Sequence, residues 1–93
     1  MVNLRIPTPL RSYTEGKQLV QVAGNNVDEA LNNLVIIFPA LKKHLYNDNE
    51  ELRPFINLYL GDEDICYLQG INTPLRNGDT LIIIPSIAGG ICN

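Results

Sequence analysis

Apolar and polar residues alternate in several short stretches, which is typical of strands with one buried face. Residues 2–6 alternate strictly, and residues 18–22 repeat the pattern with Val20 and Val22 on the expected inner side. Residues 55–60 predict a third strand, and a weaker pattern near 65–67 predicts a short fourth one. Residues 80–85 are apolar almost throughout, so we expect this last strand to be central and either covered on both faces or left with an apolar outer face.

One stretch has helical spacing instead. Asn26 has the chemistry of an N-cap, and Glu29 three residues later resembles a capping box. Pro39 ends the helix because it disfavours helical backbone at the preceding residue. The apolar residues on one stripe of this helix are Val27, Ala30, Leu31, Leu34 and Phe38.

The order of these elements predicts the fold. Residues 7–17 indicate a hairpin loop, and residues 41–52 a polar loop with a short helical turn. A helix that follows a hairpin and returns to the sheet covers one face of it, with the first and last strands side by side in the middle. We therefore expect an α+β fold over residues 1–88, a β-grasp (ubiquitin-like) roll. Its mixed sheet has four to five strands, with one main helix packed on one face. We expect residues 89–93 to form a flexible di-glycine tail with a removable tripeptide.

Composition excludes several classes of function. The 93 residues carry a net charge of −3 without a cluster of Lys or Arg, which argues against a nucleic-acid or membrane-surface partner. No signal peptide or apolar run of membrane-spanning length is evident, so we expect a cytoplasmic protein. Cys66 and Cys92 could form one disulfide but lack the spacing of a zinc site, and we expect no bound metal or cofactor.

The pair Gly89-Gly90 follows the last strand closely. Glycine is costly to order, so this is an unfavourable way to end a fold. It suits a narrow segment that enters another protein's active site, where the reactive group would be the backbone carboxyl. The alternative is a frayed end without function.

Several segments carry a family resemblance across nearly the whole chain. They are Ile6-Pro7-Thr8-Pro9-Leu10-Arg11, Gly24, Asn26-Val27, Ala30-Leu31, Arg53, Phe55, Asn57, Tyr59, Leu68-Gln69-Gly70, Thr73-Pro74-Leu75, Gly78-Asp79 and Ile84-Pro85-Ser86-Ile87-Ala88-Gly89-Gly90. In these residues the chain resembles the MoaD/ThiS family of ubiquitin-like sulfur carriers, most of all its CysO-like branch.

The resemblance implies a protein substrate rather than an enzyme. An adenylating enzyme of the ubiquitin-activating type would use ATP to activate the carboxyl group of Gly90, and sulfur would then displace AMP to leave a thiocarboxylate. The favoured acceptor is a pyridoxal-phosphate-dependent cysteine synthase. Molybdopterin synthesis (as the synthase's small subunit), thiamine sulfur delivery and protein modification stay open as alternatives. A different class is a binding module with an inert tail.

The chain departs from the family pattern after the glycines. Most members of the family stop at the second glycine, whereas Gly90 is followed here by Ile91-Cys92-Asn93. A Gly90 carbonyl in a peptide bond cannot be adenylated. We expect cleavage between Gly90 and Ile91, with Cys92 leaving in the tripeptide, and the resemblance implies a JAMM-type zinc metalloprotease as the agent.

The third and last strands also predict a docking surface. Alternation divides their side chains between the core, which takes Ile56, Leu58, Leu60, Leu81 and Ile83, and the opposite face. An exposed apolar face beside the tail is typical of a partner site; the alternative is that the 7–17 or 41–52 loop covers it. The predicted docking residues are Phe55, Asn57, Tyr59, Ile82, Ile84 and Ile87.

Other reactive side chains favour structural interpretations. Cys66 is expected to be a half-buried strand residue, and His44 a solvated residue in a loop. Asp62, Glu63 and Asp64 are expected to be solvated acids in a turn. No nucleophile–base pair or phosphate-binding loop is apparent, which disfavours an independent enzyme.

Overall fold

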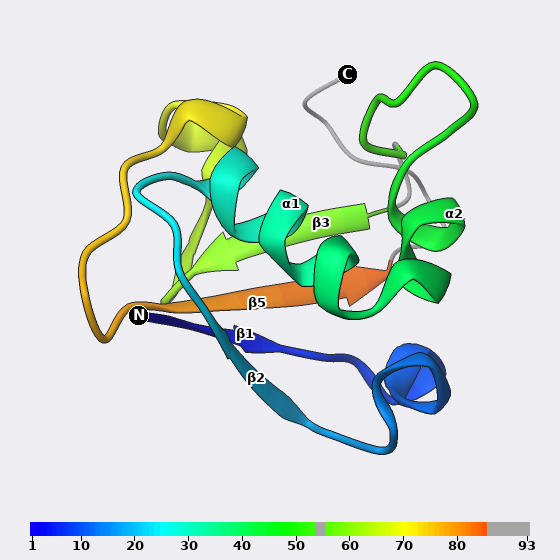
Figure 1. Ribbon diagram of the computed structural model, residues 1–93. Coiled ribbons are helices and arrows are strands. Elements are labelled where there is room, and N and C mark those ends of the chain that lie inside the picture. The colour runs from blue at the N-terminus through cyan, green and yellow to red at the C-terminus, as the bar shows by residue number, and fades with distance from the viewer. Residues whose placement is uncertain (54–55, 86–93) are drawn as a thin grey trace.

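Five strands form one mixed sheet in the order β2-β1-β5-β3-β4 (Figure 1). The computed structural model describes residues 1–53 and 56–85. The strands are β1 (Val2–Arg5), β2 (Leu19–Val22), β3 (Ile56–Leu60), β4 (Glu63–Asp64) and β5 (Thr80–Pro85).

The last strand, β5, lies at the centre of the sheet as predicted. It runs parallel to β1, with Leu81 opposite Leu4, and antiparallel to β3, with Ile83 opposite Leu58. Both of its edges are therefore hydrogen-bonded to neighbouring strands, so the position of β5 is fixed as far as Pro85.

Helix α1 (Val27–Ile37) covers one face of this sheet (Figure 1). It begins as predicted, since the Asn26 side chain accepts a hydrogen bond of 2.8 Å from the Glu29 N–H. The carboxylate of Glu29 accepts from the Asn25 N–H at 3.0 Å, one residue earlier than in a standard capping box. Phe38 ends the helix before Pro39 because a residue preceding proline avoids helical backbone.

The approach to α1 is unusually close at Gly24. A Cβ built on Gly24 would lie 2.8 Å from the backbone nitrogen of Ala30 and 2.9 Å from its Cα. Only glycine lets the chain pass the helix at this distance.

The core lies between α1 and the sheet and extends to the end where β5 finishes. There the chain forms short helical segments: η1 (Thr8–Thr14), η2 (Pro39–Leu41) and α2 (Lys42–Leu45). The predicted hairpin loop 7–17 is thus largely a 3-10 helix, whereas the predicted helical turn within 41–52 is confirmed as α2. The core residues include Leu4, Leu31, Leu34, Leu58, Leu81 and Ile83, with Leu10, Leu41 and Leu45 from η1, η2 and α2.

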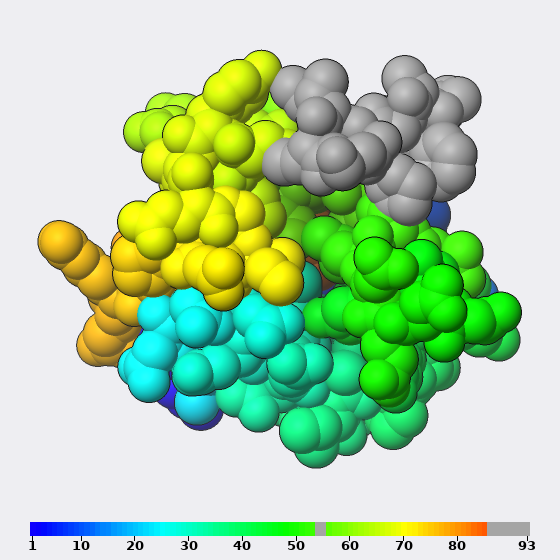
Figure 2. Space-filling model, turned by 90° about the horizontal axis from the view of Figure 1, so that it is seen from above, coloured from blue at the N-terminus to red at the C-terminus, as the bar shows by residue number. Residues whose placement is uncertain are grey.

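The predicted strand near 65–67 is wrong. These residues form a 3-10 helix, η3 (Ile65–Tyr67), because the Asp64 carboxylate accepts from the Cys66 N–H at 3.0 Å and turns the chain. The fourth strand, β4, lies immediately before it. A further 3-10 helix, η4 (Gly70–Asn72), packs against α1, and Figure 2 shows it beside the first turns of α1 on one surface.

Candidate partner-docking surface

The outer face of the sheet presents a row of paired side chains. Asn57 is paired with Ile84, and Tyr59 with Ile82. Directly paired residues point to the same face of a sheet, so these four side chains stand together, away from α1. Ile84 is 39% exposed and the other three are half-buried.

The row continues across the two remaining strands on this side. Arg5 of β1 is paired with both Ile82 and Leu19, and Leu19 is 51% exposed. The outer face therefore has an apolar centre with an arginine inside it. We call the set Arg5, Leu19, Asn57, Tyr59, Ile82 and Ile84 the outer-sheet patch.

The alternation that separates this patch from the core is confirmed by burial. Leu58, Leu81 and Ile83 are 1%, 0% and 2% exposed and face α1, while Ile56 and Leu60 are half-buried against the core. The long connecting segments send Leu10, Leu41 and Leu45 into that same core. The docking role of the patch stays a prediction.

Several predicted site residues lie outside the described residues. These are Phe55, Ile87, Gly89, Gly90 and Ile91. The structure describes the strand that leads to the glycines and ends at Pro85, which is exposed. Gly90 is five residues after Pro85, a reach of at most about 18 Å for extended chain.

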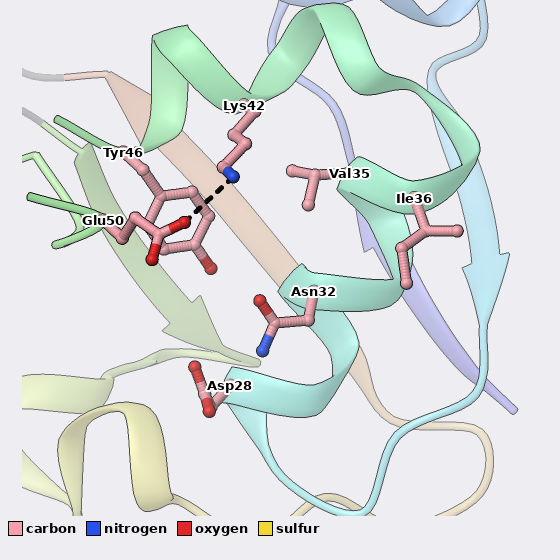
Figure 3. Close-up of a pocket in the computed structure, with 7 residues that line it drawn as sticks. All are labelled: Asp28, Asn32, Val35, Ile36, Lys42, Tyr46 and Glu50. Carbon is pink, nitrogen blue, oxygen red and sulfur yellow. Dashed lines mark hydrogen bonds and ion pairs between the residues drawn. The ribbon is translucent and has the colours of Figure 1, made fainter. Parts of the chain in front are cut away.

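A groove that no sequence pattern indicates lies on the opposite side of the molecule (Figure 3). It has a volume of about 480 Å³, and the ion pair between Lys42 Nζ and Glu50 Oε1, at 3.1 Å, closes one side. Its lining residues are Asp28, Asn32, Val35 and Ile36 of α1 with Lys42, Tyr46 and Glu50.

The hydroxyl of Tyr46 is buried beside this groove without a hydrogen-bond partner among the described residues. Burial, with a contribution from the charge of Asp28, raises the pKa of Tyr46 to about 12. The phenol is therefore neutral at ordinary pH and is a poor candidate for a base or nucleophile. The sequence did not indicate that Tyr46 is buried, because residues 41–52 are mostly polar and predict a loop. In the structure Tyr46 folds back onto α1.

The prediction that His44 is solvated is wrong. It belongs to α2, is half-buried, and its ring lies 4.3 Å from the ring of Tyr13 in η1, measured between centroids. Its Nε2 atom is buried without a hydrogen-bond partner in the described part of the chain. The helical turn of α2 directs this side chain inward, and no residue pairs with it for acid–base catalysis there.

The remaining candidates are structural. Asp64 is not solvated as predicted but 7% exposed, because it caps η3, while Asp62 and Glu63 are exposed. Cys66 is half-buried in η3 rather than in a strand, and it is not a free thiol. Over residues 1–53 and 56–85, no group of three or more His, Cys, Asp or Glu could hold a metal ion.

The described helices are also too short or too polar to cross a bilayer.

A mixed sheet with a central last strand and one helix across it defines a β-grasp domain of the ubiquitin-like type, as predicted. The chain belongs to the ThiS family, whose sequence pattern matches residues 4–90.

Individual relatives agree with this assignment. The chain is 31% identical to the sulfur carrier protein CysO of Mycobacterium tuberculosis over 91 residues, covering 96% of this chain and 98% of that protein. A chain in the crystal structure of the Amycolatopsis orientalis BexX/CysO complex is 37% identical, with a TM-score of 0.85 and coverage of 97% and 100%.

The small archaeal modifier protein 1 of Methanosarcina acetivorans has the same fold. It is 27% identical, with a TM-score of 0.85 and coverage of 96% of this chain and 95% of that one. The predicted resemblance to CysO-like members of the MoaD/ThiS family is thus confirmed.

Proposed function

We propose that this ubiquitin-like sulfur carrier is activated at the carboxyl group of Gly90. The family pattern extends to residue 90, and the structure adds that β5, the strand leading there, is held on both edges. A carboxylate oxygen of Gly90 attacks the α-phosphate of ATP on a partner of the ubiquitin-activating type, and pyrophosphate leaves. A sulfur nucleophile then displaces AMP, leaving a thiocarboxylate on Gly90.

Two glycines suit this chemistry on steric grounds. A tail that carries its own carboxyl group to a bound nucleotide must bring backbone close to the phosphates, and glycine has no Cβ to obstruct that approach. In this scheme the chain supplies the substrate and the partner supplies the catalytic groups.

Activation requires an earlier cleavage. Gly90 is joined to Ile91 by a peptide bond, so its carboxyl group must first be released by hydrolysis. A JAMM-type zinc metalloprotease is the proposed agent, acting between these two residues.

The relatives favour cysteine biosynthesis as the destination of the sulfur. The Mycobacterium tuberculosis relative is a sulfur carrier protein CysO, and the Amycolatopsis orientalis relative was crystallised in a complex with BexX. We therefore propose a pyridoxal-phosphate-dependent cysteine synthase as the acceptor. Likeness to an archaeal modifier protein supports protein modification as the second candidate, in which Gly90 would be joined to a lysine amine.

The test compares chains with different C-termini. Chains ending at Gly90, at Gly89 and at Asn93 are incubated with the cognate adenylating enzyme and ATP, and pyrophosphate release is measured. Only the chain ending at Gly90 is expected to release pyrophosphate at the full rate. Mass spectrometry then follows replacement of one carboxyl oxygen by sulfur.

Equal release from the intact 93-residue chain would contradict the need for cleavage. No release from any of the three chains would leave the inert binding module as the better interpretation. An isopeptide bond to a target lysine, formed without thiocarboxylate transfer to a cysteine precursor, would favour the modifier.

A further inference from the structure

Positive and negative side chains separate along the axis of β5, although neither end stands out in the sequence. The end where β5 finishes also holds η1, α2 and the end of β1, and the end where β5 begins holds the start of α1 and the turn after β3 (Figure 1). The first end carries Arg5, Arg11, Lys17, Lys42, Lys43 and Arg53 with Glu15, Asp48, Glu50 and Glu51. The second carries Arg76 with Asp28, Glu29, Asp62, Glu63, Asp64 and Asp79.

These sets give the two ends opposite signs. Six cations against four carboxylates leave +2 where β5 finishes, and one cation against six carboxylates leaves −5 where it begins, which together make the net charge of −3. We call the first the basic end and the second the acidic end.

Few cations of the basic end are paired directly with an acid in the described part of the chain. Lys42 is paired with Glu50, and it forms the one ion pair within the described residues. Two other cations are fixed by backbone carbonyls rather than by acids: Arg11 Nε donates to the Ile6 oxygen at 3.1 Å, and Arg53 Nε donates to the Lys43 oxygen at 2.9 Å. Such contacts hold the guanidinium groups in place without neutralising them.

Salt screening makes each end act separately. The six residues of β5 span about 20 Å, whereas the Debye length at physiological ionic strength is about 8 Å. A protein that approaches the basic end therefore meets positive potential rather than the net negative charge of the whole chain.

We propose that the basic end docks against a carboxylate-rich rim on the protein that receives the tail. This inference rests on the proposed function, in which that protein takes Gly90. β5 ends at Pro85 within the basic end, and Gly90 lies at most about 18 Å beyond it, so a protein that takes Gly90 comes close to the basic end. An acidic rim attracts this end and repels the acidic end, which orients the chain before contact.

The first experiment uses matched single charge reversals. Arg5→Glu, Lys17→Glu and Lys43→Glu change the basic end, while Arg76→Glu changes the acidic end. All four side chains are exposed, and each variant has a net charge of −5. Thermal unfolding verifies that each variant is folded.

The readout is association with the cognate adenylating enzyme, using chains that end at Gly90. Each basic-end reversal is expected to slow association and raise KM several-fold at low salt, with an unchanged kcat and a weaker salt dependence. Arg76→Glu should leave KM within about twofold of the parent value. Equal effects of all four reversals, or none from the basic-end variants, would overturn the proposal.

A second probe does not depend on activation. Oligoglutamate is titrated into the full chain and followed by NMR, with backbone shifts expected around Lys17 and Lys43 but not around Asp62. Shifts of equal size at both ends would count against the proposal. If the parent chain releases no pyrophosphate, the proposed function fails, and this titration still decides whether the basic end attracts carboxylates.

Discussion

Replacing Ile84 by alanine is expected to weaken partner binding about three- to eightfold without unfolding the chain. Full burial of an isoleucine side chain is worth about 1.5–3 kcal/mol. Ile84 is 39% exposed in the free chain, so docking can still bury about that fraction. The lost contribution is then about 0.6–1.2 kcal/mol, and a factor of ten in Kd corresponds to about 1.4 kcal/mol.

Two other isoleucines serve as controls. Ile36 of α1 is 73% exposed on the opposite side of the molecule, so Ile36→Ala should leave partner binding unchanged. Ile83 is the next residue in β5 but is 2% exposed, so Ile83→Ala should cost about 2–5 kcal/mol of unfolding free energy.

The assay has two parts. Calorimetry gives the Kd for the cognate adenylating enzyme with chains ending at Gly90, and urea unfolding gives the stability of each variant. The reasoning is refuted if Ile84→Ala binds as tightly as the parent chain while Ile36→Ala binds more weakly, because the partner would then use the helix side.

Three further changes test the site and its supports. Gly90→Ala, in a chain ending at that residue, should reduce pyrophosphate release at least about tenfold because the added Cβ keeps the tail from the nucleotide. Gly24→Ala should lower the free energy of unfolding by about 1–3 kcal/mol, measured by urea unfolding, since its Cβ would meet the Ala30 backbone at 2.8–2.9 Å. The raised pKa of Tyr46, about 12, predicts stability that is complete below pH 10 and lost as the pH rises through 12. Tyr46→Phe should remove that part of the pH dependence, and an unchanged profile would assign it to other groups.

The strands, the main helix and the two faces of the sheet could be predicted from sequence because each depends on local periodicity. Alternation along β5 places Leu81 and Ile83 on one face and Ile82 and Ile84 on the other in any sheet of this kind. The start of α1 was equally local, since the Asn26 cap and the acids after it lie within one turn.

The failures came where neighbours distant in sequence, or in one case a local cap, decide the outcome. His44 is half-buried because Tyr13, in a segment about 30 residues earlier, lies against it. Residues 65–67 resemble a strand in composition, yet the Asp64 cap turns them into a 3-10 helix. Tyr46 has an exceptional pKa only because its hydroxyl is buried near Asp28 of α1.

The chemistry proposed for the end of the chain rests on the sequence alone, because a glycine pair after a strand suits a backbone carboxyl that, once released, enters a partner. The tertiary structure decided which charged surface surrounds the end of β5. Arg5, Lys17 and Lys43 are spread through the sequence, and they share one end only because β1 and β5 run parallel and η1 and α2 close the core there. The spacing of charges along the sequence does not reveal which of them lie together. The electrostatic potential around the folded chain depends on their positions in space.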